Sequence, residues 1–248
     1  MKIYAYGVID SNSRIEDPDK GIEGGHIYNI PYRGIGIAVS DLDGRHQKNV
    51  NPDHVLEHER VAEKLMESFT VLPMRFFTIF NDKEKILSMM SGYYDSFNEN
   101  LNRLRGKLEF GLKVIWPGNT IKKRISGNND GKAQKKHLLN GSPARNYIME
   151  KFEKYKVDRQ FEEEGHKYVS IIDKFFSGFA VEKNLDTLKS DELLLVASYL
   201  VEKAKQDDFK QAFERLKKGG LNDLKYLFSG PWPPYNFINL TKSEGKKG

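Results

Sequence analysis

Gly230-Pro231-Trp232-Pro233-Pro234-Tyr235-Asn236-Phe237 is the stretch that most constrains the fold of this 248-residue chain. Proline fixes its own φ angle and restricts the residue before it, so we expect neither a helix nor a central strand here. The stretch predicts a stiff, extended or turning segment that presents three aromatic rings. The candidate structural residues are Pro231, Pro233 and Pro234, and the candidate protein-binding residues are Trp232, Tyr235 and Phe237.

Two roles are open for these rings. In the first, all of them are core residues that pack on the sheet of the C-terminal half of the chain. In the second, at least one ring stays at the surface and touches a partner protein. An aromatic side chain can bury on the order of 150–250 Å², so either role would matter energetically. The sheet residues expected beneath the rings are Val114, Leu195, Ala197 and Leu227.

The composition excludes several classes of protein. There is no cysteine, which excludes disulfides, thiol nucleophiles and cysteine-based metal sites. The longest apolar run, residues 193–201, is too short to span a bilayer, and the N-terminus has no apolar signal segment. We therefore expect a cytoplasmic protein that has no membrane partner.

The first half of the chain predicts an α+β domain over residues 1–106. Aromatic and β-branched residues indicate strands, and two windows with apolar residues at helical spacing indicate helices. Asn51-Pro52 is typical of a helix start, and Asn81 with Glu84 resembles a capping box. The expected strands are 2–9, 27–30, 35–40 and 70–80, and the expected helices begin near 52 and 81.

The second half predicts a ferredoxin-like domain over residues 107–238, followed by a polar tail at 239–248. Its elements follow the order β-α-β-β-α-β. The expected strands are 107–116, 185–188, 193–201 and 224–228, and the expected helices are 143–179 and 207–217. The long helix has Ile148, Phe152, Tyr155, Phe161, Tyr168, Ile172, Phe175 and Phe179 at helical spacing. The whole chain is thus expected to be an α+β protein with two domains.

Residues 117–142 predict a flexible basic insertion. The segment 117–145 has seven basic residues against one acidic residue, Asp130, and few apolar side chains. The basic side chains of such a loop could bind the phosphates of RNA, and an RNA-binding module is therefore one alternative function. A lysine-rich loop also serves solubility alone, and the aromatic RNA-binding motif is absent, so we expect no specific nucleic acid.

A second alternative function comes from His54-Val55-Leu56-Glu57-His58. The H-x-x-E-H pattern places two histidines one turn apart on a helix, as in inverted zinc peptidases, with Glu57 as the base. A zinc-dependent hydrolase would need a third ligand from elsewhere. However, His58 lies on the apolar face of its helix, which favours a hydrogen-bonded core histidine. We therefore expect no metal, no cofactor and no catalytic residue.

Arg75 is a candidate structural residue. It lies in residues 71–80, which read as a strand that is apolar on both faces. An unpaired charge would be costly at a buried position, so the pattern predicts an internal ion pair for this guanidinium.

Several motifs together resemble the gas vesicle GvpL/GvpF family. They follow the same order along nearly the whole chain. They are Leu72-Pro73-Met74-Arg75-Phe76 with Thr78, Glu109-Phe110-Gly111-Leu112-Lys113-Val114 before Trp116, Ser142-Pro143, and Gly230–Phe237, supported by Tyr4-Ala5-Tyr6-Gly7-Val8 and Glu57-His58-Glu59. Two positions depart from the family pattern, because Phe77 and Ala144 stand where glycine is common.

The resemblance implies an accessory or minor structural protein of gas vesicle assembly that has no enzymatic role. It implies contact with the major shell protein GvpA and with other accessory Gvp proteins, in the cytoplasm and at the gas vesicle. It also implies two domains, of which the second has a modified ferredoxin-like fold.

Overall fold

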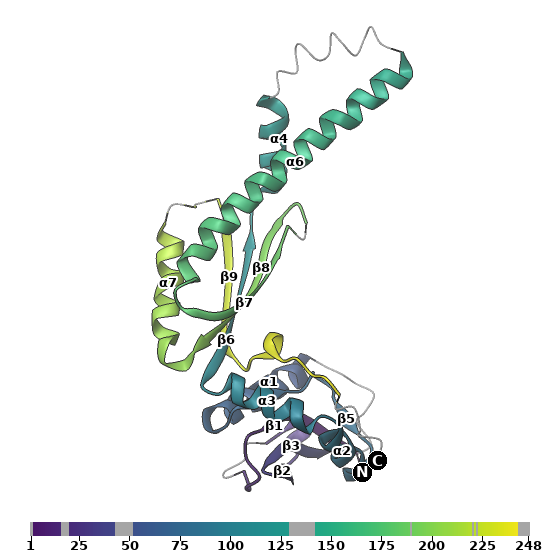
Figure 1. The fold of residues 1–248 in the computed structure, drawn as a ribbon, viewed down its shortest axis with the longest axis vertical. Helices are drawn as coiled ribbons and strands as arrows, with labels where there is room; N and C mark the ends of the chain where they lie inside the picture. The colour runs from purple at the N-terminus through teal and green to yellow at the C-terminus, as the bar shows by residue number, and fades with distance from the viewer. Residues whose placement is uncertain are drawn as a thin grey trace. The chain divides into compact units, whose positions relative to one another are not determined.

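The computed structural model describes residues 2–15, 20–42, 52–128, 142–188, 190–219, 221 and 223–242. These residues form two compact units. The first unit combines Met1–Glu109 with Pro231–Gly248, and the second is Phe110–Gly230. Both units contain helices and a sheet, so the predicted α+β class with two domains is confirmed (Figure 1).

The sheet of the first unit is built around its first strand. Its order is β2-β3-β1-β4, and β5 also pairs with β1. All of these pairings are antiparallel. A bulge between Ala5 and Gly7 leaves Tyr6 as the extra residue of β1. The strands are β1 (Lys2–Ile9), β2 (Ile27–Tyr32), β3 (Ile35–Leu42), β4 (Val71–Pro73) and β5 (Ile79–Phe80).

Helices complete the core of the first unit. The predicted second helix is in fact two helices, which meet at Tyr93. Asp82, rather than Asn81, caps α2, because its carboxylate accepts a hydrogen bond from the backbone N–H of Lys85 at 2.8 Å. The helices are α1 (Pro52–Ser68), α2 (Lys83–Gly92) and α3 (Tyr94–Leu104), with a 3₁₀ turn, η1 (Ile22–Gly24), between β1 and β2.

The strand expected at residues 70–80 is interrupted. β4 ends at Pro73, and a turn leads to β5. Phe77 lies in this turn with φ at +69°. The Arg75 side chain is exposed, so the prediction of a buried ion pair at this residue is wrong. Its structural contribution comes from the main chain instead, since the Arg75 carbonyl accepts hydrogen bonds from the backbone N–H and the hydroxyl of Thr78.

The second unit has the predicted β-α-β-β-α-β order, and its sheet order is β7-β8-β6-β9. Helices α6 and α7 cover one face of this sheet (Figure 1). Stacked rings fill the space between them, such as Phe213 and Phe228, whose centroids are 4.2 Å apart. The elements are β6 (Lys107–Ile115), α4 (Gly118–Asn128), α6 (Pro143–Phe176), β7 (Ala180–Thr187), β8 (Leu193–Glu202), η2 (Lys203–Lys205), α7 (Gln206–Lys218) and β9 (Lys225–Trp232).

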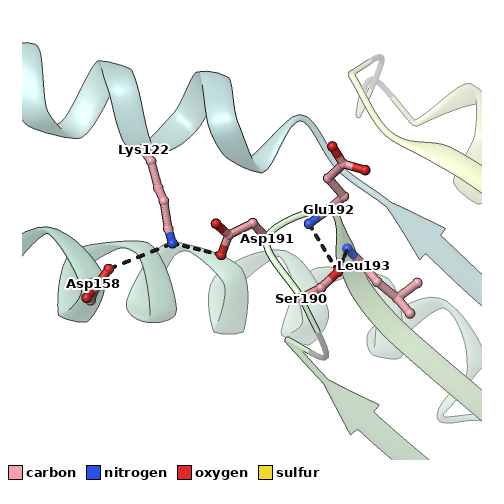
Figure 2. A network of polar contacts seen from close by, with 6 residues as sticks. All are labelled: Lys122, Asp158, Ser190, Asp191, Glu192 and Leu193. Carbon is pink, nitrogen blue, oxygen red and sulfur yellow. Dashed lines mark hydrogen bonds and ion pairs between the residues drawn. The ribbon is translucent and has the colours of Figure 1, made fainter.

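Part of the expected flexible insertion is an anchored helix. Figure 2 shows Lys122 of α4 between two carboxylates, Asp158 of α6 and Asp191 of the β7–β8 loop. The Lys122 ammonium is 2.7 Å from Asp191 and 3.7 Å from Asp158. Gly118 packs so closely that an added Cβ would lie 1.6 Å from the Asp191 carbonyl oxygen. The prediction of flexibility is therefore wrong for residues 118–128, and residues 129–141 lie outside the described residues.

The division of the chain also differs from the predicted one. The C-terminal domain was expected to extend to residue 238, but residues from Pro231 onward cluster with the first unit. β9 includes Pro231 and Trp232, which a proline-rich stretch was not expected to do. The strand tolerates Pro231 because β9 is an edge strand of the sheet that the described residues form, and an edge strand has ladder hydrogen bonds on one side only.

Candidate functional site

The C-terminal segment binds the first unit through a set of polar contacts. The Glu109 carboxylate accepts one hydrogen bond from the backbone N–H of Asn236 at 2.8 Å and another from its side-chain amide. Further along, the Asn100 side chain exchanges hydrogen bonds with the backbone of Asn239. Arg103 donates to the carbonyl oxygen of Phe237. These contacts hold the segment against α3 and the start of β6.

The prolines and the rings of this segment are mostly buried. Pro233 and Pro234 are buried, Pro231 and Trp232 are half-buried, and the Phe237 ring is only 3% exposed. Phe237 is thus a core residue, whereas Trp232 and Tyr235 keep part of their surface exposed, so the choice between the two predicted roles stays open. Residues from Pro231 onward cluster with the first unit, and the Tyr235 hydroxyl contacts His58 and Glu59 there, so the expectation that this ring packs on the sheet of the second unit is wrong. Leu227, expected beneath them, is 58% exposed.

Tyr235 enters a buried polar cluster centred on His58. The ring nitrogen Nε2 of His58 donates to the Met74 carbonyl oxygen at 3.1 Å, because a carbonyl can only accept. Nδ1 therefore accepts from the Tyr4 hydroxyl at 2.9 Å. The Tyr235 hydroxyl lies 3.4 Å from Nε2 and donates to the Glu59 carboxylate at 3.3 Å. The cluster joins β1, α1, the β4–β5 turn and the terminal segment.

Burial determines the charge state of this cluster. Desolvation lowers the pKa of His58 below its ordinary value, and the hydrogen bond to Met74 opposes this only in part. Desolvation also raises the pKa of Glu59, although the hydrogen bond from Tyr235 works in the other direction. The pKa of the Tyr235 hydroxyl is raised, first by burial and then by the charge of Glu59. His58 is therefore a neutral, hydrogen-bonded core residue near pH 7, as its place on the apolar face predicted.

The same geometry bears on the zinc hypothesis. Both ring nitrogens of His58 are engaged in hydrogen bonds within the fold, so neither offers a lone pair to a metal ion. His54 is half-buried in the first turn of α1. Within the described ranges, no three His, Asp or Glu side chains come together in a way that could hold a metal. The His54/Glu57/His58 pattern has no structural support as a catalytic site.

The basic segment proposed for RNA is partly committed to internal ion pairs. Lys122 contacts Asp158 and Asp191, and Arg124 contacts Glu164 at 3.5 Å. Both cations thus attach α4 to its surroundings. Lys132, Lys135 and Lys136 lie outside the described residues. Nothing in the described residues favours the RNA-binding alternative.

The first half of α6 carries an exposed apolar surface that the sequence pattern did not reveal. Ile148, Phe152 and Tyr155 were expected on the same buried face as Phe161. In the structure, the buried face of α6 begins only at Phe161, and the three earlier side chains are exposed. The first half of the helix extends beyond the sheet together with α4 (Figure 1). Tyr155 and Phe161 are six positions apart and therefore lie on different faces of the helix. This change of face could have indicated that the earlier side chains are exposed.

Comparisons with known proteins identify the fold and the family. The family described as gas vesicle synthesis protein GvpL/GvpF matches residues 2–239. Gas vesicle protein F1 of Halobacterium salinarum is 24% identical over 242 residues, covering 96% of this chain and 93% of that protein. Gas vesicle protein L1 of the same organism is 21% identical over 254 residues, covering 94% of this chain and 89% of that protein. Among the described residues, no helix has the length and apolarity needed to cross a membrane.

Two solved structures share the fold over nearly the whole chain. The crystal structure of GvpF from Microcystis aeruginosa matches with a TM-score of 0.80 at 20% identity, covering 96% of this chain and 99% of that one. GvpF from Anabaena sp. PCC7120 matches with a TM-score of 0.79 at 16% identity, covering 97% and 99%. The two-unit architecture is therefore one that solved gas vesicle proteins adopt.

Proposed function

The chain belongs to the GvpL/GvpF family of gas vesicle synthesis proteins, and on this premise we propose that it is an accessory or minor structural protein that supports gas vesicle assembly. It binds the major shell protein GvpA and other accessory Gvp proteins, in the cytoplasm and at the growing vesicle. The family match over residues 2–239 is the observation that carries this proposal.

The physical need for such a protein follows from the nature of the shell. A wall that keeps water out must present apolar surface, and that surface is exposed before the wall closes. Exposed apolar surface drives association, so an unassembled shell protein is prone to aggregate. A soluble partner that covers this surface until it reaches the growing wall would prevent premature aggregation.

The role is not enzymatic. His58 and Tyr235, two titratable groups of the first unit with shifted pKa values, belong to one hydrogen-bonded network in the interior of that unit. Perturbed pKa values can mark an active site, but buried structural networks produce them as well. Here the hydrogen bonds join four segments of the fold, which supports a structural role for the network.

The sheet edges do not favour binding by strand addition. Proline cannot donate a hydrogen bond to an added strand, and charged residues also discourage pairing at an edge. Pro31 lies in the edge strand β2, Pro73 in β4 and Pro231 in β9. At the other edge of the second sheet, β7 carries Glu182, Lys183 and Asp186. These features favour recognition through a helix face.

Deletion of the gene from a host that forms gas vesicles tests the assembly role. The deletion strain should form no vesicles or far fewer vesicles in electron micrographs, and a plasmid copy should restore them. A deletion strain with normal vesicle number and shape would refute the proposal. The control is complementation with a gene that carries an exposed change outside the family motifs, Glu99→Gln, which should restore vesicles fully.

A further inference from the structure

The exposed apolar surface of α6 has the geometry of a helix-binding seam. Ile148, Phe152 and Tyr155 are separated by four and three residues, so they lie in one row along the helix. Their side chains are 64%, 49% and 61% exposed. We call these three residues the α6 stripe. A row at this spacing is what interdigitates with a second helix, whereas a strand would need alternation by two.

Basic residues border the α6 stripe on both sides. Side chains three or four positions apart are neighbours on a helix surface. Each member of the α6 stripe has at least one basic residue at that spacing. The bordering basic residues are Arg145, Lys151, Lys156 and Arg159.

The acidic residues nearby are held in ion pairs, two of them with basic residues of the border itself. Arg159 pairs with Glu163 at 3.1 Å. Asp158 is three positions from Tyr155, but its carboxylate pairs with Lys122 of α4. Glu153 pairs with Lys156 at 3.1 Å, while the same ammonium group stays 4.6 Å from the centre of the Phe152 ring. The four basic residues outnumber Glu153 and Glu163, so the surface is apolar at its centre and has a net positive charge at its border.

From this surface we propose that the first half of α6 docks an amphipathic helix of a partner protein whose apolar stripe is bordered by acidic side chains. Burying the α6 stripe against such a helix removes its apolar area from water. The acidic border meets the basic border of α6, which adds specificity and speeds association. The partner is thus defined by its chemistry, an apolar helix face with carboxylates on both sides.

An anionic membrane fits the surface less well. Helices that lie in a membrane interface bury a broad apolar face into the lipid. The α6 stripe, with the exposed Tyr147 and Met149 beside it, is short, because Ile148 and Tyr155 are about 10 Å apart along the helix axis. That size fits the side of one helix. This inference deepens the proposed function and rests on it only for the idea that the partner is an assembling protein with apolar helices.

Synthetic peptides test the surface directly. The probe is a fluorescent helical peptide of about 20 residues with an apolar stripe bordered by glutamates. The matched peptide carries lysines at the same border positions. Anisotropy titrations with the full chain should show about tenfold tighter binding of the glutamate peptide, and added salt should reduce this preference.

Variants of α6 locate the binding. Phe152→Ser should weaken binding of the glutamate peptide by about tenfold or more. Ile171→Ser changes another exposed apolar residue of α6, away from the stripe, and should leave binding unchanged. Lys151→Glu combined with Lys156→Glu should reverse the preference toward the lysine peptide. All these side chains are exposed, and circular dichroism melting curves verify that each variant folds.

Three outcomes would overturn the proposal. The first is equal binding of both peptides, and the second is binding of neither. The third is binding of anionic phosphatidylserine vesicles that Phe152→Ser abolishes, without any peptide preference, which would assign the surface to lipid. Vesicle formation in the deletion strain is scored separately, so the docking surface and the assembly role can fail independently.

Discussion

The Glu109 carboxylate accepts two hydrogen bonds from Asn236, which is 127 residues away in the sequence. Glu109 is only 4% exposed. The other residues on its face of β6 are less buried, since Lys107 and Gly111 are half-buried and Lys113 is exposed. A buried carboxylate requires such partners, because an unsatisfied charged group is costly. This pair fixes the C-terminal segment on the first unit.

Replacing Glu109 tests the strength of this attachment. Glu109→Gln keeps one oxygen that can accept from the backbone N–H of Asn236. It removes the charge and places the new glutamine NH₂ group against the NH₂ group of Asn236, which is also a donor. We expect a loss of about 1–3 kcal/mol in the free energy of unfolding, measured with a chemical denaturant. Glu99→Gln on the exposed face of α3 is the matched control and should change stability by less than about 0.5 kcal/mol. Equal effects of the two changes would show that the pair does not hold the segment.

The backbone at Phe77 allows a test by two substitutions at the same residue. Its φ of +69° is unfavourable for any residue with a Cβ. Both Phe77→Gly and Phe77→Ala remove the ring, but only glycine relieves the backbone. The glycine variant should be more stable than the alanine variant by about 1 kcal/mol.

A helical position supplies the control with the opposite sign. Glu99→Gly should be less stable than Glu99→Ala by about 1 kcal/mol, because glycine disfavours a helix interior. If alanine were the more stable replacement at Phe77 as well, the left-handed turn between β4 and β5 would be wrong.

The lowered pKa of His58 predicts a pH dependence of stability. Its folded-state pKa lies below the ordinary value of 6.5, so the unfolded chain binds the proton more readily. The stability that comes from keeping His58 neutral is fully present above pH 6.5, and it is lost as the pH falls through the folded-state pKa. The pKa of Glu59 is raised in the folded state, so the contribution of Glu59 to stability increases as the pH falls.

His58→Gln isolates this term, since glutamine can still accept from Tyr4 and donate to Met74. The stability difference between the wild-type protein and this variant should shrink as the pH falls from about 7.5 to about 5.5. His166→Gln, an exposed position of α6, should show no such trend. A difference that stays constant across this range would contradict a neutral, buried His58.

Two glycines of α4 test whether this helix is anchored. An added Cβ at Gly118 would meet the Asp191 backbone, whereas one at Gly127 would meet nothing within 4 Å. Gly118→Ala should therefore destabilise the protein by about 2 kcal/mol or more. Gly127→Ala should stabilise it by about 0.5–1 kcal/mol, because alanine favours a helix. If Gly118→Ala were as harmless as Gly127→Ala, the first residues of α4 would not be packed against the β7–β8 loop.

Local patterns predicted much of the secondary structure. The alternation of apolar and polar residues in β6, and the aromatic and β-branched residues of β1, identify these strands without any tertiary information. The order of strands and helices in the second half was enough to predict its ferredoxin-like order. The family motifs then predicted the family, and the match over residues 2–239 confirms it.

Long-range contacts could not be predicted in the same way. The attachment of Asn236 to Glu109 leaves no local signal in either segment, so the contacts of Tyr235 with the first unit were not predicted. Arg75 was expected in a strand because its neighbours are apolar, but the left-handed Phe77 breaks the strand there. Helix α4 was read as an insertion because its own residues are polar, and its anchor, Lys122, depends on carboxylates far along the chain.

The central claim is that this protein binds unassembled shell protein and keeps it in solution. The most direct measurement is co-expression of GvpA with the full chain, followed by ultracentrifugation and pull-down of the soluble fraction. We predict that GvpA stays in the supernatant and is captured with the wild-type chain, and that it sediments when an unrelated soluble α+β protein replaces the chain. GvpA that sediments equally in both cases, and is never captured by the chain, would contradict the account.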